Sequence, residues 1–300
     1  MDVLMPLKKG KYLAYLCLRT LTGAREDAVR RRSLRRPYKY DATRYEVRVA
    51  DVVMPESTTF LVNHLAHSRE EPRPPLRRAP ERLFLLWTGA NAMSENRLRS
   101  IDQIKRMNAD LEVTIVTPDN IDDFIVNGHP LHDCWRSLSY VHRSDYLRAY
   151  LMHHWGGAYA DVKMMNKPWR PVIDRLNGDP DLWAAGPAEL SEFNATSTGG
   201  RLGRDVKRNF GQVLCQAAFA FKPGSSWTEE WLSEVERRLN HYSDLLRDRG
   251  EGGPRDRYPE YPLCWNVLLG QVHAPLSLKY RSHLWVDQTM RYVFDSNGYR

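Results

Sequence analysis

The chain has 300 residues and a mass of 35.0 kDa, enough for one large domain with a full hydrophobic core. Hydrophobic residues make up 42% and charged residues 27%, which excludes a disordered or collagen-like protein. The longest apolar run, Tyr12 to Leu18, has seven residues, so no segment is predicted to span a bilayer. No small-residue cleavage site follows that run, so a secretory signal is not expected either. We therefore expect a cytoplasmic protein.

The positive charge is concentrated at the N-terminus. Residues 1–40 contain eleven Lys or Arg and three acidic residues, whereas the other 260 residues carry 33 basic and 34 acidic ones. A basic stripe on the folded body, as expected of a nucleic-acid-binding protein, is therefore not predicted. Apolar residues interleaved with the lysines suit a basic segment lying on an anionic membrane surface, and a solubilising lead-in is the alternative.

The first 80 residues form a basic arm with a linker. A strand is predicted at 45–53, and a Pro/Arg-rich linker follows at 71–80. The arm therefore covers residues 1–80, and a folded domain is predicted for residues 81–300.

The domain begins with alternating strands and helices. The apolar run 82–89 predicts a buried strand, and the spacing of Leu98, Ile101 and Ile104 predicts a helix from Ser94 to Asn108. A second strand is predicted at 111–117 and a short helix at 121–126. This alternation is typical of an α/β protein with a parallel sheet.

A longer helix and a third strand carry the polar residues of interest. The helix, predicted from Ser139 to Trp155 with one buried stripe, ends at the pair Gly156 and Gly157. The strand 158–164 that follows should direct Tyr159, Asp161 and Lys163 to one side. Polar side chains at the end of such a strand are placed to meet a ligand.

These side chains suit a substrate that contains both phosphate and sugar. Arg148 and Lys163 can neutralise phosphate, and Asp145 and Asp161 can accept hydrogen bonds from sugar hydroxyls. A purely structural interpretation stays open, because Asp145 and Arg148 could form an ordinary helix-surface pair. The two glycines could likewise serve only as a helix cap.

Their order and spacing resemble a known family. The patterns Ser144-Asp145-x-x-Arg148 and Gly156-Gly157-x-Tyr159-x-Asp161-x-Lys163 resemble the signature of family 32 glycosyltransferases, which include an initiating mannosyltransferase and bacterial capsule enzymes. The spacing is also similar to that of the large clostridial glucosylating toxins. Leu86-Trp87-Thr88-Gly89 resembles the first-strand motif of this group, and the resemblance covers about residues 82–275.

The resemblance implies a GT-A fold, a Rossmann-like α/β domain with a mixed, mostly parallel sheet. It also implies transfer, with retention of configuration, from a UDP- or GDP-sugar to a glycan or lipid-linked acceptor in polysaccharide biosynthesis. Asp145 and Arg148 would hold the donor sugar. Trp87 would stack on the base, and Tyr159 and Asp161 would contact ribose and diphosphate. The remaining residues expected to contact the donor are Thr88, Gly89, Gly156 and Gly157.

One position departs from the family pattern. Lys163 stands where a second aspartate usually ligates Mn²⁺ or Mg²⁺. An ammonium cannot ligate a metal but can pair with phosphate, so Lys163 could take over part of the metal's electrostatic role. Alternatively, Asp161 still holds the metal with a later residue such as His273 or Asn266, or the chain is inactive.

An inactive chain would belong to a different functional class. It would be a degenerate GT-A-fold protein that acts as a membrane or nucleic-acid-binding adaptor through its basic arm. An active enzyme would bind its nucleotide sugar at the cytosolic face of a membrane, and the arm would provide a peripheral contact. Glycine-rich stretches at 198–203 and 250–259 are predicted to be mobile loops.

Overall fold

The computed structural model describes residues 24–49, 52–55, 71–195, 199–254, 256 and 260–292. Its centre is a six-stranded sheet in the order β4-β3-β5-β7-β6-β8. The strands are β3 (Arg82–Leu86), β4 (Glu112–Val116), β5 (Gly157–Ala160), β6 (Ala184–Pro187), β7 (Ala218–Phe221) and β8 (Leu284–Asp287). Only β7 runs antiparallel to its neighbours in this sheet, which confirms the predicted α/β class with a mixed, mostly parallel sheet.

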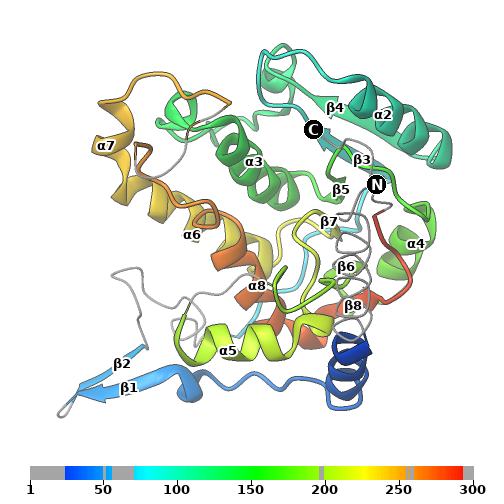
Figure 1. Ribbon diagram of the computed structural model, residues 1–300, viewed down its shortest axis with the longest axis vertical. Helices are drawn as coiled ribbons and strands as arrows, with labels where there is room; N and C mark the ends of the chain where they lie inside the picture. The colour runs from blue at the N-terminus through cyan, green and yellow to red at the C-terminus, as the bar shows by residue number, and fades with distance from the viewer. Residues whose placement is uncertain are drawn as a thin grey trace, which may run out of the picture.

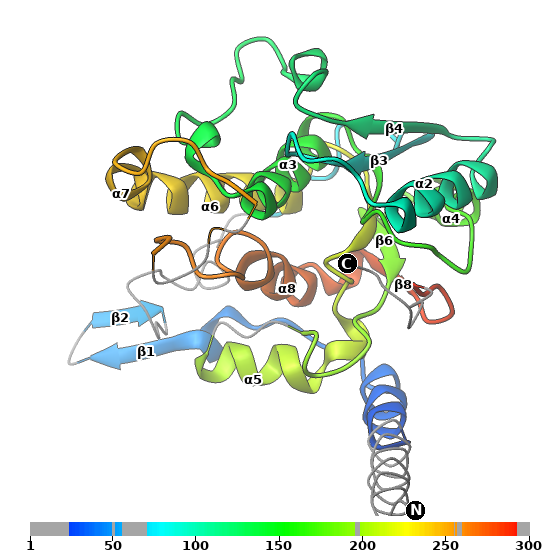
Figure 2. The same cartoon turned by 45° about the horizontal axis from the view of Figure 1, so that its top comes forward.

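Helices cover both faces of the sheet (Figures 1 and 2). The helices are α2 (Glu95–Met107), α3 (Tyr140–His154), α4 (Arg170–Gly178), α5 (Gly200–Arg208), α6 (Ser226–His241), α7 (Ser243–Arg247) and α8 (Gly270–Lys279). Helices α3, α6 and α8 share one hydrophobic cluster with Phe84 and Phe219 of the sheet. Helices α2 and α4 share a second cluster with Leu83 and Ala220, so the sheet lies between two helical layers.

Most elements predicted between residues 82 and 164 are present. Strand β3, helix α2 and strand β4 lie where the sequence predicts them, while the short helix is only a 3-10 turn, Ile121–Phe124. The third strand is shorter than predicted and ends at Ala160, but its alternation is confirmed. Tyr159 faces the cluster of α3, whereas Ala158 and Ala160 face that of α2 and α4.

Helix α3 is more deeply buried than its sequence indicates. The single apolar stripe that we expected is wrong, because ten of its residues are buried, including Asp145 and Arg148. The helix packs between the sheet and α6, and so little of its circumference reaches solvent. Its polar residues therefore face other parts of the protein.

The described part of the arm packs on the body. Residues 24–34 are helical, and the predicted strand 45–53 is instead a 3-10 turn, Ala42–Tyr45, followed by the antiparallel strands β1 (Glu46–Val49) and β2 (Val52–Pro55). The Tyr45 hydroxyl donates to Asp205 of α5 at 2.8 Å, and Arg30 donates to the Leu190 carbonyl at 2.7 Å. Residues 1–23 lie outside the described residues.

Other predictions concern membranes, thiols and loops. No helix among the described residues is both long and apolar enough to cross a membrane. The cysteines in the described part, Cys134, Cys215 and Cys264, are free thiols. The expected loop at 198–203 is wrong from Gly200 onward, where α5 begins. Residues 196–198, 255 and 257–259 lie outside the described part of the chain.

Gly156 and Gly157 make the turn between α3 and β5. Their φ angles are +70° and +93°, in the left-handed region that favours glycine. A Cβ atom on Gly157 would lie 2.8 Å from the Arg82 carbonyl oxygen, and one on Gly156 would lie 2.6 Å from Pro223. Both glycines therefore allow the chain to reverse in close contact with the neighbouring strands.

Replacing Gly157 by alanine should destabilise the fold. The positive φ and the Arg82 contact together are expected to lower the free energy of unfolding by roughly 1–3 kcal/mol, measured by urea denaturation. Gly178→Ala at the end of α4 is the control, since its Cβ would meet no atom within 4 Å. Equal stability of Gly157→Ala and the wild type would contradict this account of the turn.

Candidate functional site

The direction of the strands gathers the candidate residues at one edge of the sheet. Strands β3, β4, β5, β6 and β8 all end at this edge, and β7 begins there. The segments that leave the edge contain Thr88, Asp161 and Glu189, and Gln216 lies just before β7. This is the edge at which α/β proteins commonly bind ligands.

Asp161 lies at the centre of a polar cluster that follows β5. Its Oδ1 accepts a hydrogen bond from the Tyr159 hydroxyl at 2.7 Å, and the Arg148 Nη2 lies 3.3 Å away. Its Oδ2 accepts from the Lys163 Nζ at 2.7 Å. Arg148 also lies over the Tyr159 ring, with 4.8 Å between the guanidinium carbon and the ring centroid. The sequence-predicted residues Tyr159, Asp161, Lys163 and Arg148 are therefore brought together.

Helix α3 adds a second carboxylate to this cluster. Asp145 lies one turn before Arg148, and its Oδ1 is 3.5 Å from the Arg148 Nη1. Both side chains are at least nine-tenths buried, so they do not form the ordinary surface pair that we considered. Arg148 is further held by the Gln216 carbonyl oxygen at 3.3 Å. One guanidinium thus links α3 to β5 and β7.

The ionisation of this cluster leaves an excess of positive charge. Burial would raise the pKa of Asp161, but the ion pairs with Arg148 and Lys163 hold that pKa below its usual value. Burial raises the pKa of Asp145 to about 7, although Arg148 opposes the shift. Near neutral pH, two cations therefore face one full carboxylate and one that is partly protonated.

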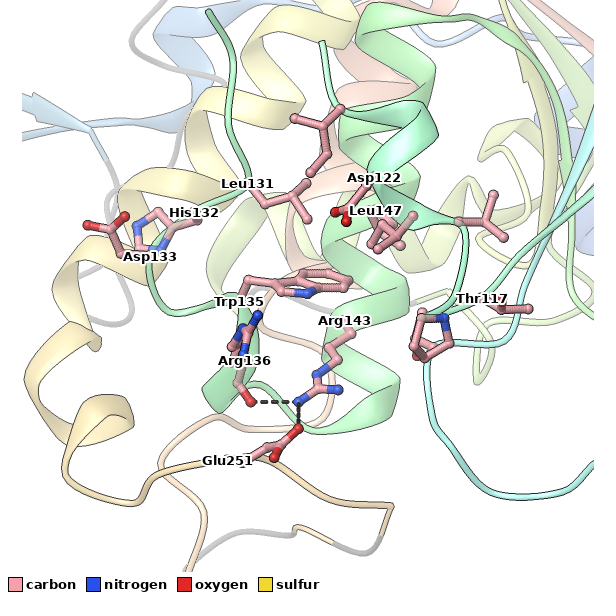
Figure 3. Close-up of a pocket in the computed structure, with 15 residues that line it drawn as sticks. Thr117, Asp122, Leu131, His132, Asp133, Trp135, Arg136, Arg143, Leu147 and Glu251 are labelled. Atoms are coloured by element: carbon pink, nitrogen blue, oxygen red, sulfur yellow. Dashed lines mark hydrogen bonds and ion pairs between the residues drawn. The ribbon is translucent and has the colours of Figure 1, made fainter. Parts of the chain in front are cut away.

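A pocket of about 480 Å³ opens beside the ends of β3 and β4; we call it the Trp135 pocket. Its lining includes Thr88, the backbone turn after β4 and the indole ring of Trp135. Figure 3 shows Arg143 next to Trp135, and the Arg143 Nη2 donates to the Arg136 carbonyl at 2.6 Å and lies 3.6 Å from a Glu251 carboxylate oxygen. A flat ring with nearby hydrogen-bonding groups suits a planar heterocycle.

The first-strand motif lies partly in this pocket. Thr88 lines it and donates to the Tyr140 carbonyl at 2.5 Å, but Trp87 is not among the lining residues. The Trp87 indole N–H instead donates to the Asn91 carbonyl at 2.8 Å. Gly89 allows close approach of the Tyr140 ring, which a Cβ atom would overlap. The indole ring in the pocket comes from Trp135, which was not predicted from the sequence. No sequence motif or regular spacing around Trp135 indicates a binding residue.

Gly156 and Gly157 do not lie with the other predicted ligand-binding residues. Gly156 precedes β5 and Gly157 is its first residue, whereas Asp161 follows the strand, so the length of β5 separates them from the cluster. Their neighbours are Pro223, Arg82 and Pro80 rather than site residues. The structure therefore does not bring the two glycines to the cluster, and their close backbone contacts and positive φ angles account for both.

His273 does not join Asp161 either. It is fully buried on α8, and its ring lies 4.9 Å from that of Trp231 and 5.2 Å from that of Phe219. Burial lowers the pKa of His273 to about 3, as expected of a neutral core residue. The structure therefore places the predicted metal ligand in the aromatic core, where neither of its ring nitrogens has a hydrogen-bond partner among the described residues.

The described residues do not fit a divalent metal ion. Both oxygens of Asp161 already accept hydrogen bonds from protein groups, and Lys163 occupies the space beside Oδ2. No group of three His, Cys, Asp or Glu side chains in the described ranges could hold a metal. Proteins commonly hold Mg²⁺ through one or two carboxylates together with waters and substrate phosphates. Asp161 is already paired with Lys163 at 2.7 Å, so we assign no step to a metal.

A second pocket, of about 370 Å³, lies between the ends of β5, β6 and β7; we call it the Glu189 pocket. Lys163 and Gln216 belong to its lining, and both touch the Asp161 cluster. Glu189 is 5% exposed, and its Oε1 accepts from the Gln216 backbone N–H at 3.0 Å. Burial raises the pKa of Glu189 to about 8, although hydrogen bonds from Gln216 oppose the shift. The sequence analysis missed Glu189.

The fold and this edge define an α/β protein with a cationic cluster between two pockets. A family model described as "Capsular polysaccharide synthesis protein" matches residues 45–176. The match contains the Asp161 cluster and most of the Trp135 pocket, and it agrees with the predicted resemblance to capsule enzymes. It ends before Glu189.

Comparisons with individual proteins add little. A solved structure named "PaToxG Glycosyltransferase" is similar, with 12% sequence identity and a TM-score of 0.34. The similarity covers 60% of this chain and 67% of that one. We assign no role to any residue of the site from this similarity. The search of curated proteins found no match.

Glu189 should make stability depend on pH. Its folded-state pKa of about 8 lies above the ordinary value of 4.5, so the folded protein binds more protons between these values and loses stability as the pH rises. Glu189→Gln removes this titration. The free energy of unfolding of Glu189→Gln minus that of the wild type should be larger at pH 8 than at pH 5 by at least about 1 kcal/mol, measured by urea denaturation. If the difference in free energy of unfolding between the two proteins did not change with pH, the raised pKa of Glu189 would be contradicted.

Proposed function

We propose that this protein is a glycosyltransferase of polysaccharide biosynthesis that transfers a sugar from a nucleotide-sugar donor to a glycan or lipid-linked acceptor. The observation that carries the proposal is the cluster of Asp145, Arg148, Tyr159, Asp161 and Lys163 between two pockets at the carboxyl edge of the sheet. The family match over residues 45–176 supports the same conclusion.

The two ends of the donor require different surroundings. The nucleobase would enter the Trp135 pocket and stack on the indole of Trp135, in place of the expected Trp87. The diphosphate would then lie against Arg148 and Lys163, and the sugar would present its hydroxyls to Asp145 and Asp161. Carboxylates accept hydrogen bonds from hydroxyls, and guanidinium and ammonium groups neutralise phosphate. UDP- and GDP-sugars both meet these requirements.

The leaving diphosphate gains negative charge as the bond to the sugar breaks. We assign its stabilisation to Arg148 and Lys163, because preorganised cations at developing charge lower the barrier. Tyr159 and Asp161 hold both cations in place through the contacts described above. Retention of configuration follows from the family resemblance and forms part of the proposal.

The basic arm provides a surface for membrane contact. Helical residues 24–34 and the turn that follows expose Arg25, Arg31, Arg32, Arg35 and Arg36, while Val29, Arg30 and Ser33 face the body. We therefore include peripheral binding to an anionic membrane in the proposal. Such a contact would bring the enzyme to a lipid-linked acceptor.

Donor turnover tests the enzymatic proposal. The full chain is incubated with UDP- and GDP-sugars in Mn²⁺, Mg²⁺ or EDTA, and released nucleotide is measured. We expect release from at least one donor, with most of the rate kept in EDTA. Lys163→Met should lower the rate by about 10–100-fold, because it removes a charged hydrogen-bond donor from the diphosphate.

Lys105→Met on the exposed side of α2 is the matched control and should leave the rate unchanged. Lys163→Asp should make release depend on Mn²⁺, since a second carboxylate restores a D-x-D ligand pair. A Lys163→Met enzyme that releases nucleotide at the wild-type rate would contradict the role of the lysine. Absence of both nucleotide release and UDP or GDP binding would contradict the transferase and favour the adaptor hypothesis.

Vesicle co-sedimentation tests the arm. The full chain should bind vesicles of phosphatidylcholine with phosphatidylserine more strongly than phosphatidylcholine alone. The triple variant R31E/R32E/R35E should lose about 100-fold in binding, since each basic residue near the surface contributes about 1 kcal/mol. R99E/K105E/R106E on α2 is the control of equal charge change. Equal loss in both variants would argue against a specific role of the arm.

A further inference from the structure

The Glu189 pocket contains two aromatic rings that face solvent. Phe193 is 86% exposed and Trp265 is 63% exposed, and both line this pocket. Every other Trp, Phe and Tyr among the described residues is buried or half-buried. Because exposed rings of this size are unfavourable in water, their gathering at one pocket indicates a binding surface.

Polar groups lie among these rings. Glu189 presents a buried carboxyl group of which Oε1 is held by the Gln216 backbone, and the Asn266 side-chain amide belongs to the same lining. A side-chain amide can both donate and accept hydrogen bonds, and so can a protonated carboxyl group. Flat apolar faces next to such groups match a sugar ring, which has an apolar C–H face and polar hydroxyls around its edge.

The pocket opens on the candidate reaction centre. Lys163 and Gln216 line it, and the same two residues contact Asp161 and Arg148. A sugar in this pocket would therefore lie beside the place where the donor sugar meets its diphosphate. The Trp135 pocket lies on the other side of the cluster, at the ends of β3 and β4.

We propose that the Glu189 pocket binds the acceptor glycan, with sugar rings on Trp265 and Phe193 and hydroxyls bonded to Glu189 and Asn266. The inference rests on the proposed transferase function, because an acceptor is needed only if a sugar is transferred. It makes Trp265 and Phe193 specificity-determining residues that lie outside the segment matched by the capsule-synthesis family.

Sugar binding tests the inference without any donor. The full chain is titrated with glucose, galactose, mannose, N-acetylglucosamine, rhamnose and glucuronic acid, and binding is measured by saturation-transfer NMR. At least one of these sugars should bind. Trp265→Ala should weaken that binding by about tenfold, Phe193→Ala should weaken it less, and Trp265→Tyr should keep most of it.

Leu245→Ala is the matched control, because Leu245 is 58% exposed on α7 and lies outside the pocket lining. Its sugar binding should equal that of the wild type. Nucleotide release from the donor, measured without an acceptor, should be unchanged in Leu245→Ala, and it is measured in parallel in Trp265→Ala. Transfer to the bound sugar should fall in the same variant.

Two results would overturn the inference. One is that none of the six sugars binds to the wild-type protein, and the other is that binding is equally strong in Trp265→Ala. Neither result affects nucleotide release, so the transferase proposal would stand or fall on that separate measurement. Sugar binding that depends on Trp265, together with neither nucleotide release nor UDP or GDP binding, would support a glycan-binding pocket and contradict the transferase.

Discussion

The partly buried carboxylate of Asp161 is the constraint on which the site depends. Taking this charge out of water is costly unless it is paired, and Arg148, Lys163 and Tyr159 together occupy both of its oxygens. Arg148 must in turn come from a helix buried on nearly every side. The packing of α3 between the sheet and α6 therefore decides where the cationic groups of the site lie.

The direction of the strands explains why two pockets flank this carboxylate. Five strands end at the same edge, so the segments after β3 and β4 form one pocket and those around β5, β6 and β7 form the other. The antiparallel strand β7 matters because it brings Gln216 to the edge, where its carbonyl holds Arg148 and its N–H holds Glu189. One backbone segment thus connects the two halves of the site.

Local sequence patterns predicted the centre of the site but not its surroundings. The alternation of Tyr159, Asp161 and Lys163 and the spacing of Asp145 and Arg148 are short-range features, so they can be read from a single sequence. Glu189 meets Gln216 only through the order of strands in the sheet, which no periodicity encodes. Trp135 lines the pocket beside β3 and β4 through the tertiary fold alone. Gly156, Gly157 and His273 do not join the cluster, for the opposite reason. Their residue types suit ligand binding, but chain reversal and core packing place them elsewhere.

Lys163 gives the cluster different electrostatics from those expected with an aspartate, the residue that the family resemblance implies at this position. A second aspartate would leave two carboxylates beside each other, and their repulsion would need a bound cation in addition to Arg148. The ammonium of Lys163 instead pairs with Asp161 directly at 2.7 Å, while Arg148 lies between Asp161 and the partly protonated Asp145. In the proposed enzyme, a diphosphate would meet positive charges that belong to side chains of the protein and not to a separately bound metal ion. The attraction of the proposed enzyme for an anionic donor would therefore follow from the fixed positions of α3 and β5 in the fold.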